Sequence, residues 1–342
     1  MTDNQQDLID RIDRELWVPT EALIADLDRL DGDLLVLGAG GKMGLSLCRM
    51  ATEAGARGRS RTVTAVSRFS DPEQAAAFTE AGIQIHRADL ADRDALAALP
   101  DVENVVFLVG RKFGTAGAAS TTWALNTLVP ALVAERFRDS RIAALSSGNV
   151  YPLTPVHSGG ADEDVAPDPV GEYAQSVLGR ERMFEHFSRT HGTKVSLLRL
   201  NYAIDGRYGV LHDVATKVRE GTPIDLTTST ANVIWQGDAN AVVLRSLRHA
   251  ASPPQVYNLT GPETISIRWL ANQFARRFGT EAVFTGTEAD TALLSNAARI
   301  NQRFGYPRVS LRQMIDWTAQ WLDAGGPTIA KPTDFQQREG TF

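Results

Sequence analysis

A glycine-rich loop directly between an apolar run and a helical stretch is the feature that most restricts how this chain folds. The apolar run covers 33–37, and the segment GAGGKMG at 38–44 follows it. Glycines permit a sharp turn from strand to helix and let a pyrophosphate approach the backbone, while the helix N-terminus faces the anion. A plain structural turn would use the same residues. The strand before the loop and the helix after it favour dinucleotide binding.

Segments typical of strands and helices alternate at short intervals after this loop as well. Strands are expected at 33–37, 61–66, 83–86, 105–109, 142–145 and 195–198, and helices at 45–58, 74–81, 91–98, 120–137 and 172–190. Such alternation is typical of a parallel sheet with helices on both faces. We therefore predict an α/β fold with a doubly wound parallel sheet, the Rossmann arrangement, and a smaller, mostly helical C-terminal substrate domain.

The regular alternation of strands and helices ends at Asn201. Beyond it, helices are expected near 210–220, 238–250, 266–278 and 311–324. The predicted units are an N-terminal helical extension at 1–30, a dinucleotide-binding domain at 31–203, a substrate domain at 204–328 and a C-terminal arm at 329–342. The segment near 232–250 is expected to return to the dinucleotide-binding domain.

Composition narrows the class of partner. A net charge of -6 gives no broad attraction for nucleic acid or an anionic membrane, so we expect a small-molecule substrate. The single cysteine, Cys48, cannot form an internal disulfide, and the six histidines lack metal-ligand spacing, so no metal site is expected. The acidic N-terminus and the lack of a long apolar run predict a cytoplasmic chain.

The segment after the second expected strand bears on the choice of cofactor. An acidic side chain there would bind the ribose 2′-hydroxyl of NAD, but this chain has Ser67 and Arg68. A hydroxyl and a guanidinium suit a 2′-phosphate, so the sequence favours NADP and leaves NAD open. The predicted cofactor-binding residues are Gly38, Gly41, Lys42, Met43, Gly44, Ser67, Arg68, Asp89, Leu90 and Gly110.

Several short motifs occur in a characteristic order. They are LGAGGKMG at 37–44, ADLAD at 88–92, Asn126, SSGNVY at 146–151, EYAQS at 172–176 and YNLTGPETISIRWLA at 257–271. In this order and spacing the chain resembles the extended short-chain dehydrogenase/reductase family, the NAD-dependent epimerase/dehydratase group. The resemblance implies a bound nicotinamide dinucleotide and hydride transfer matched by proton transfer.

The resemblance also implies a catalytic set, with one departure. Ser147 falls on the family's serine, which hydrogen-bonds the substrate oxygen, and Tyr173 falls on the tyrosine that exchanges the proton. The family's lysine, four residues further on, is replaced by Val177. A phenol with an ordinary pKa of about 10 is roughly 0.1% ionised at neutral pH, so Tyr173 needs another cation to act as a base.

Three nearby cations are candidates for that replacement: Arg111, Lys112 and Arg180. Lys112 is favoured because a lysine gains and loses a proton, whereas an arginine stays charged. A surface or structural role for Lys112 is the alternative.

The substrate side departs from the family pattern too. Nucleotide-sugar members have an arginine that grips the nucleotide phosphate, whereas the matching segment here, 232–235, contains none. This favours a sugar, sugar acid, polyol or ketone, for which the predicted substrate-binding residues are Asn149, Asn201, Tyr202 and Arg207.

The leading function is thus an NAD(P)-dependent oxidoreductase or epimerase acting on a small hydroxylated or carbonyl substrate. Two alternatives stay open. One is a nicotinamide-binding sensor or scaffold without redox turnover, and the other is a lyase or isomerase that uses Ser147 and Tyr173. The resemblance also leaves a homodimer open.

Overall fold

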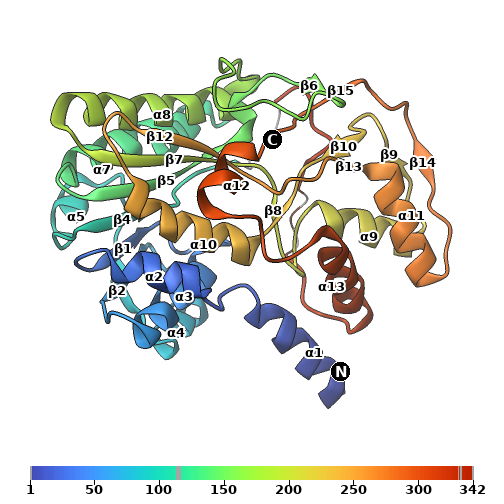
Figure 1. Cartoon of the computed structure of the whole chain (residues 1–342), viewed down its shortest axis with the longest axis horizontal. Helices are drawn as coiled ribbons and strands as arrows, with labels where there is room; N and C mark the ends of the chain where they lie inside the picture. Colours follow the sequence, from blue (N-terminus) through green and yellow to red (C-terminus); the bar gives the residue numbers. More distant parts are fainter. Residues whose placement is uncertain (1, 113–116, 330, 332, 341–342) are drawn as a thin grey trace.

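A seven-stranded sheet, parallel throughout, forms the centre of the molecule (Figure 1). The computed structural model describes residues 2–112, 117–329, 331 and 333–340. In the strand order β12-β7-β5-β4-β1-β2-β3, the two βαβ halves meet between β1 and β4. Their bounds are β1 (Leu34–Leu37), β2 (Val63–Ser67), β3 (Gln84–Arg87), β4 (Asn104–Phe107), β5 (Arg141–Ser147), β7 (Lys194–Leu200) and β12 (Gln255–Leu259). The predicted doubly wound fold is confirmed.

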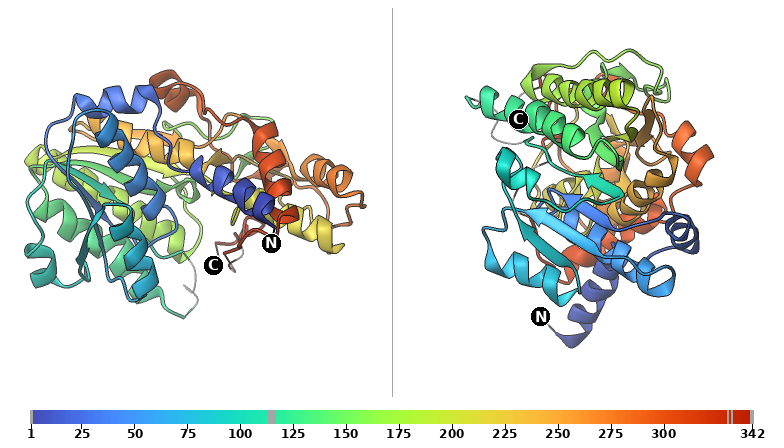
Figure 2. Two further views of the ribbon diagram at one scale, coloured as in Figure 1. Left: turned by 90° about the horizontal axis from the view of Figure 1, so that it is seen from below. Right: turned by 90° about the vertical axis from the view of Figure 1, so that its left-hand side faces the viewer.

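Helices cover both faces of this sheet because its strands are apolar on both sides. In β1, Leu34 and Val36 pack into the core on one face and Leu35 and Leu37 into the core on the other. The first face is covered by α2 (Glu21–Asp28), α3 (Gly44–Arg57), α4 (Pro72–Glu80) and α10 (Gln236–Ser246), and the second by α5 (Arg93–Ala97), α7 (Val129–Arg136) and α8 (Gly171–His191). Figure 2 shows the sheet between these two layers.

A second, smaller core lies beyond the carboxyl ends of the strands. It is built from α1 (Asp3–Arg14), α9 (Val210–Glu220), α11 (Ile267–Phe278) and α13 (Leu311–Asp323). Short paired strands connect these helices: β8 (Ala203–Ile204) with β11 (Ile234–Trp235), β9 (Ile224–Asp225) with β14 (Phe284–Thr285), β10 (Thr230–Ala231) with β13 (Ile265–Ser266), and β6 (Thr154–Pro155) with β15 (Thr291–Ala292). The predicted domain limits stay a prediction, although the two N-terminal helices pack in different cores.

Besides the short paired strands, which were not predicted, three longer elements differ from the expectations. β12 was not predicted, because Gln255–Leu259 mixes polar and apolar residues at the edge of the sheet. α12 (Ala298–Phe304) was also missed. The helix expected over 120–137 is three segments, namely α6 (Ala119–Trp123), a π-helical turn (Ala124–Leu128) and α7. Pro130 cannot donate to the Asn126 carbonyl four residues earlier, which accounts for the break.

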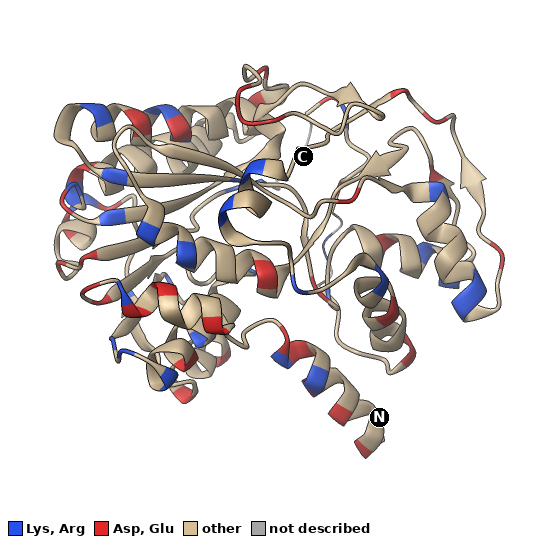
Figure 3. Cartoon of the chain, viewed as in Figure 1, with Lys and Arg blue, Asp and Glu red and all other residues tan. Residues whose placement is uncertain are grey.

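Within the described ranges, no helix is long and apolar enough to cross a membrane. In the same ranges, no three His, Cys, Asp or Glu side chains gather so that they could hold a metal ion. Lys and Arg are interspersed with Asp and Glu over the ribbon (Figure 3).

Candidate active site at the carboxyl ends of the strands

The glycine loop follows β1 and shows which of its glycines the fold itself requires. Gly38 has φ +80°, and a Cβ there would lie 2.8 Å from the Val109 nitrogen. A Cβ at Gly44 would lie 1.9 Å from the Ala39 carbonyl oxygen. At Gly41 a Cβ would meet only the Gly38 carbonyl oxygen, at 3.4 Å. The loop is therefore open at Gly41, where a phosphate would approach, and Met43 leaves the start of α3 without a side-chain cap.

Lys42 of this loop points toward the second core. Its ammonium group donates to the Ala203 carbonyl oxygen at 2.8 Å and lies 4.5 Å from the centre of the Tyr208 ring. Burial lowers the pKa of Lys42 to about 8, although the Asp205 carboxylate acts in the opposite direction. The Lys42 ammonium group is therefore held by groups of the second core, and its predicted role at the dinucleotide stays a prediction.

The loop after β2 leaves Arg68 exposed beside the glycine loop. Phe69, with φ +44°, turns into the core and packs edge-to-face on Phe78 with ring centres 5.2 Å apart. Ser67 lies next to the glycine loop, since its Oγ would be 2.5 Å from a Cβ at Gly40. This anchoring keeps the Arg68 side chain in solvent.

The two residues expected at the adenine follow β3. Asp89 is exposed, and its carboxylate accepts from the Ala91 amide at 3.0 Å. Leu90 is buried in the core under the sheet. The loop that carries them thus has a fixed shape at the carboxyl edge of the sheet.

Ser147 and Tyr173 come together at the end of β5. The Ser147 side chain lies close enough to the Tyr173 hydroxyl to act on its pKa. The Ser147 hydroxyl also donates to Asn149 Oδ1 at 2.9 Å and accepts from the Asn149 amide at 3.2 Å. Burial raises the pKa of Tyr173, while Arg180 and Ser147 act to lower it.

Val177 and Arg180 lie on the same helix as Tyr173. Val177 is fully buried in an apolar cluster with Val150, Tyr151 and Ala161, so the position of the expected lysine is filled by packing. The Arg180 guanidinium lies under the loop after β4, where a Cβ at Gly110 would be 2.9 Å from its Nη2.

The predicted substrate-binding residues are divided by the fold. Asn201 is buried beside Gly148 and Tyr202 has φ +49°, a strained conformation for an aromatic residue. Burial raises the pKa of Tyr202, and the nearby Tyr173 hydroxyl acts in the same direction. Arg207 instead pairs with the buried Asp205 at 2.9 Å. Its guanidinium is therefore held in an internal ion pair.

The C-terminal arm covers one side of the site, and sequence analysis gave it no role. Lys112 donates to the Thr333 carbonyl oxygen at 2.9 Å and lies 6.0 Å from the centre of the Tyr202 ring. Thr333 also donates through its amide to Asp213 at 3.0 Å. Burial lowers the pKa of Lys112 to about 8, opposed by Asp334 and Asp213. Lys112 is thus anchored to the arm, and its role at Tyr173 stays a prediction.

A buried ion pair beneath the site joins α8 to the sheet. Arg199 of β7 donates through Nε and Nη2 to both carboxylate oxygens of Glu181, at 3.0 and 2.8 Å. Ser146 donates to the same carboxylate, and Arg199 Nη1 donates to the Tyr151 hydroxyl at 2.7 Å. This network fixes the helix that carries Tyr173 against the strand that carries Ser147.

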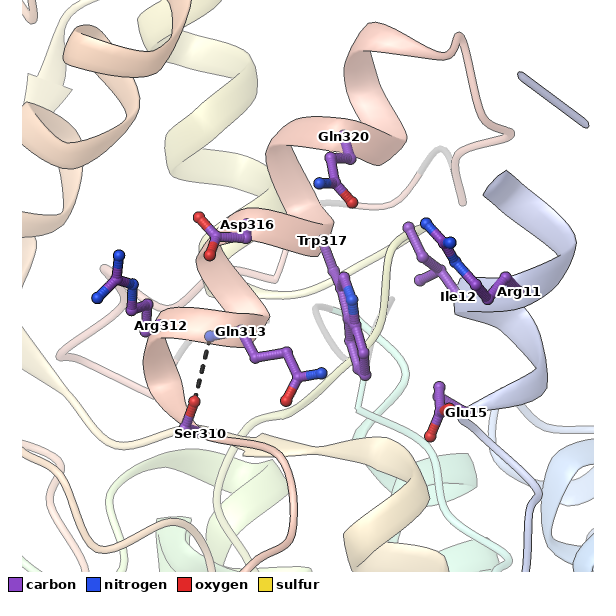
Figure 4. A pocket seen from close by; sticks show the side chains of 9 residues that line it. All are labelled: Arg11, Ile12, Glu15, Ser310, Arg312, Gln313, Asp316, Trp317 and Gln320. Carbon is purple, nitrogen blue, oxygen red and sulfur yellow. Dashed lines mark hydrogen bonds between the residues drawn. The ribbon is translucent and has the colours of Figure 1, made fainter. Parts of the chain in front are cut away.

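A separate hollow lies between α1 and α13, lined by Ile12, Glu15, Gln313, Trp317 and their neighbours (Figure 4). It contains none of the residues described above. We assign no chemistry to it.

Comparison with known proteins identifies the family. The model of the NAD dependent epimerase/dehydratase family matches residues 34–260. Among curated proteins, none matches the sequence significantly.

Solved structures with this fold include a UDP-glucose 4-epimerase from Thermotoga maritima, with 16% identity and a TM-score of 0.69 over 86% of this chain and 99% of that one. A UDP-glucuronic acid 4-epimerase from Bacillus cereus in complex with NAD has 18% identity and a TM-score of 0.69 over 85% and 98%. The dTDP-glucose 4,6-dehydratase DesIV from Streptomyces venezuelae, with NAD bound, has 19% identity and a TM-score of 0.71 over 85% and 97%. The chain belongs to the NAD dependent epimerase/dehydratase family, a group of extended short-chain dehydrogenase/reductase enzymes.

Proposed function

We propose that this enzyme is an NAD(P)-dependent oxidoreductase or epimerase acting on a small sugar, sugar acid or polyol. The observation that carries the proposal is that Ser147, at the carboxyl end of β5, lies close enough to the Tyr173 hydroxyl to act on its pKa. Ligands of open α/β sheets bind beyond the carboxyl ends of the strands, where the strand order reverses.

The residues present fit a nicotinamide dinucleotide. The open side of the loop at Gly41, the uncapped start of α3 and the exposed Arg68 supply space, amide donors and charge for its phosphates. When bound, the oxidised dinucleotide supplies a hydride acceptor. Tyr173 Oη would accept the proton of the substrate hydroxyl, and Ser147 Oγ would hydrogen-bond the substrate oxygen. These two residues would thus serve the interconversion of an alcohol and a carbonyl, for which the dinucleotide would supply the hydride acceptor or donor.

Two features support a substrate without a nucleotide. At the position of the family's phosphate-gripping arginine, Asn232 is buried and bonds the Ser295 amide at 2.8 Å and the Glu263 carbonyl at 2.9 Å. The arm packs along the same side, where Arg338 donates to the Thr291 carbonyl at 2.6 Å. The sugar-nucleotide enzymes with this fold support the sugar part of the proposal.

The proposal is tested by supplying the protein with NAD or NADP and a panel of free sugars, sugar acids, polyols and nucleotide sugars. Nicotinamide absorbance reports net oxidation, and proton NMR of the sugar reports inversion at the carbinol carbon without net change of the dinucleotide. Elimination without net hydride transfer would favour the alternative function, a lyase or isomerase. Tight dinucleotide binding with no conversion of any class would favour the sensor or scaffold.

Gly41→Val is expected to weaken dinucleotide binding at least tenfold without destabilising the protein. A Cβ added at this position would meet only the Gly38 carbonyl oxygen, at 3.4 Å, which is an ordinary contact. Gly44→Val is the contrasting variant, because its side chain collides with Ala39 and should lower thermal stability. Calorimetry and thermal melts measure both effects, and unchanged affinity in Gly41→Val would show that the loop assignment is wrong.

We also propose that NADP binds more tightly than NAD. A charge-assisted hydrogen bond from Arg68 to the 2′-phosphate contributes about 1.5–3 kcal/mol, or roughly ten- to a hundredfold in affinity. Arg68→Ala should remove most of this difference, whereas Arg93→Ala, at an exposed arginine of α5, should not. Equal affinity of the wild type for the two dinucleotides would contradict the preference.

A homodimer and a cytoplasmic location stay predictions. Trp123 and Leu128, on α6 and the π-helical turn, expose 36% and 49% of their surface, which supports association through this segment. Light scattering of the wild type and of Leu128→Glu would test it.

A further inference from the structure

The Arg180 guanidinium is a buried charge without a carboxylate partner. Arg180 is only 5% exposed, and within the described residues it forms no ion pair. Its Nη1 donates to the Leu145 carbonyl oxygen at 2.7 Å and its Nη2 to Asn126 Oδ1 at 3.0 Å, while Nε has no acceptor. A buried charge is costly unless another group compensates it.

Glu181, the residue after Arg180, forms an ion pair with a different buried arginine, Arg199. Glu181 is occupied by both donors of Arg199 and by Ser146, so its carboxylate is satisfied away from Arg180. The cation of Arg180 thus stays available to a different group. The two neutral oxygens that accept from the guanidinium cannot neutralise its charge.

The geometry of α8 directs this cation toward Tyr173. Arg180 lies seven residues after Tyr173, and two turns apart on one helix place both side chains on the same face. Side chains of a helix lean toward its N-terminus, which brings the guanidinium back toward the tyrosine. The side-chain amide of Asn126 agrees with this placement. Its oxygen accepts from Arg180 and its nitrogen donates to Ser176, which lies between Tyr173 and Arg180 on the helix.

We propose that Arg180 is the positioning residue that stabilises the ionised hydroxyl of Tyr173, in place of the cation that Val177 cannot supply. Arg180 acts from beneath the site through the field of its guanidinium and touches neither substrate nor dinucleotide. The inference rests on the proposed function, in which Tyr173 accepts the substrate proton. Burial raises the pKa of Tyr173 and the charge of Arg180 acts to lower it, which agrees with this role of Arg180.

Other charged and titratable groups also surround Tyr173. Tyr202 and Tyr208 face it from the segment after β7, and Asp334 of the arm acts on both of them. Lys112 lies beside Tyr202, and the Arg111 backbone is held by Asn126. Glu172, at the start of α8, is exposed and accepts from the Trp123 indole. None of these groups is altered in the variants below.

The test uses the holoprotein with NADP and measures two midpoints. One is the titration of Tyr173, followed by NMR of carbon-labelled tyrosine Cζ and assigned by its loss in Tyr173→Phe. The other is the pH dependence of turnover. Removing the positive charge in Arg180→Met should raise both midpoints by about one unit or more, because the phenolate loses a stabilising charge. Arg180→Lys retains a cation and should lie between Arg180→Met and the wild type.

Arg182→Met is the matched control, since Arg182 is exposed on the same helix and pairs with Glu185 at 2.8 Å. It should leave both midpoints unchanged. If Arg180→Met does not fold, Asn126→Asp places a carboxylate against the guanidinium without removing it and should raise the midpoints as well. An unmoved Tyr173 titration in a folded variant overturns the inference. Because the NMR titration needs no turnover, it separates this outcome from a failure of the proposed function.

Discussion

Tyr173→Phe is expected to reduce turnover about 10²- to 10⁴-fold, the usual contribution of a positioned acid–base group. The substitution removes one oxygen and leaves the ring in place, so dinucleotide affinity and thermal stability should stay near those of the wild type. The loss should fall on kcat, because the proton is transferred only in the chemical step. Steady-state kinetics on the substrate identified from the panel measure it.

The control for this variant is Tyr306→Phe, at a tyrosine that is 77% exposed between α12 and α13. Its turnover should match the wild type. Ser147→Ala supplies an independent check, since it removes the hydroxyl beside Tyr173 that is proposed to hydrogen-bond the substrate oxygen, and it should also reduce kcat. Full activity in Tyr173→Phe would exclude the tyrosine as acid or base, and the bound dinucleotide would then serve another chemistry.

Glu181→Gln is expected to reduce the free energy of unfolding by about 3–5 kcal/mol, because it leaves the buried Arg199 without its carboxylate. Both side chains are nearly inaccessible, at 3% for Glu181 and 6% for Arg199. A neutral amide can accept only part of the hydrogen bonds that the carboxylate receives from Arg199 and Ser146. Urea unfolding monitored by circular dichroism gives the value.

Glu185→Gln, one turn further along α8, is the matched control. Glu185 pairs with Arg182 and Arg189 at the surface, where ion pairs contribute about 0–1 kcal/mol. A loss in Glu181→Gln no larger than in Glu185→Gln would show that the buried pair does not hold α8 against the sheet. Turnover of Glu181→Gln at a temperature where it is folded reports whether the pair also positions Tyr173.

The sequence alone determined the features that depend on neighbours in the chain. The turn from β1 into α3 needs glycine at 38 and 44 because backbone atoms crowd those positions, and this requirement is visible as a local motif. The alternation of apolar strands with helices predicted the parallel sheet for the same reason. Ser147 and Tyr173 were found through motifs attached to particular strand and helix ends.

Only the tertiary structure decided which charges act at the site. Arg180 was one of the three cations that the sequence suggested. It has no carboxylate partner because Glu181, the next residue, is bound by Arg199 of β7. The fold pairs Arg207 with Asp205, and the predicted role of Arg207 at the substrate stays a prediction. These outcomes depend on distances between segments far apart in the sequence, which no local pattern records.

The positions of β12 and of the C-terminal arm also depend on contacts between distant segments. β12 forms because β7 offers an open edge, not because Gln255–Leu259 has a strong strand pattern. The arm reaches the site because Thr333 bonds Lys112 and Asp213, which lie 221 and 120 residues away. A polar segment without periodicity gives no sign of such contacts, since its position is set by the partners that the rest of the fold presents.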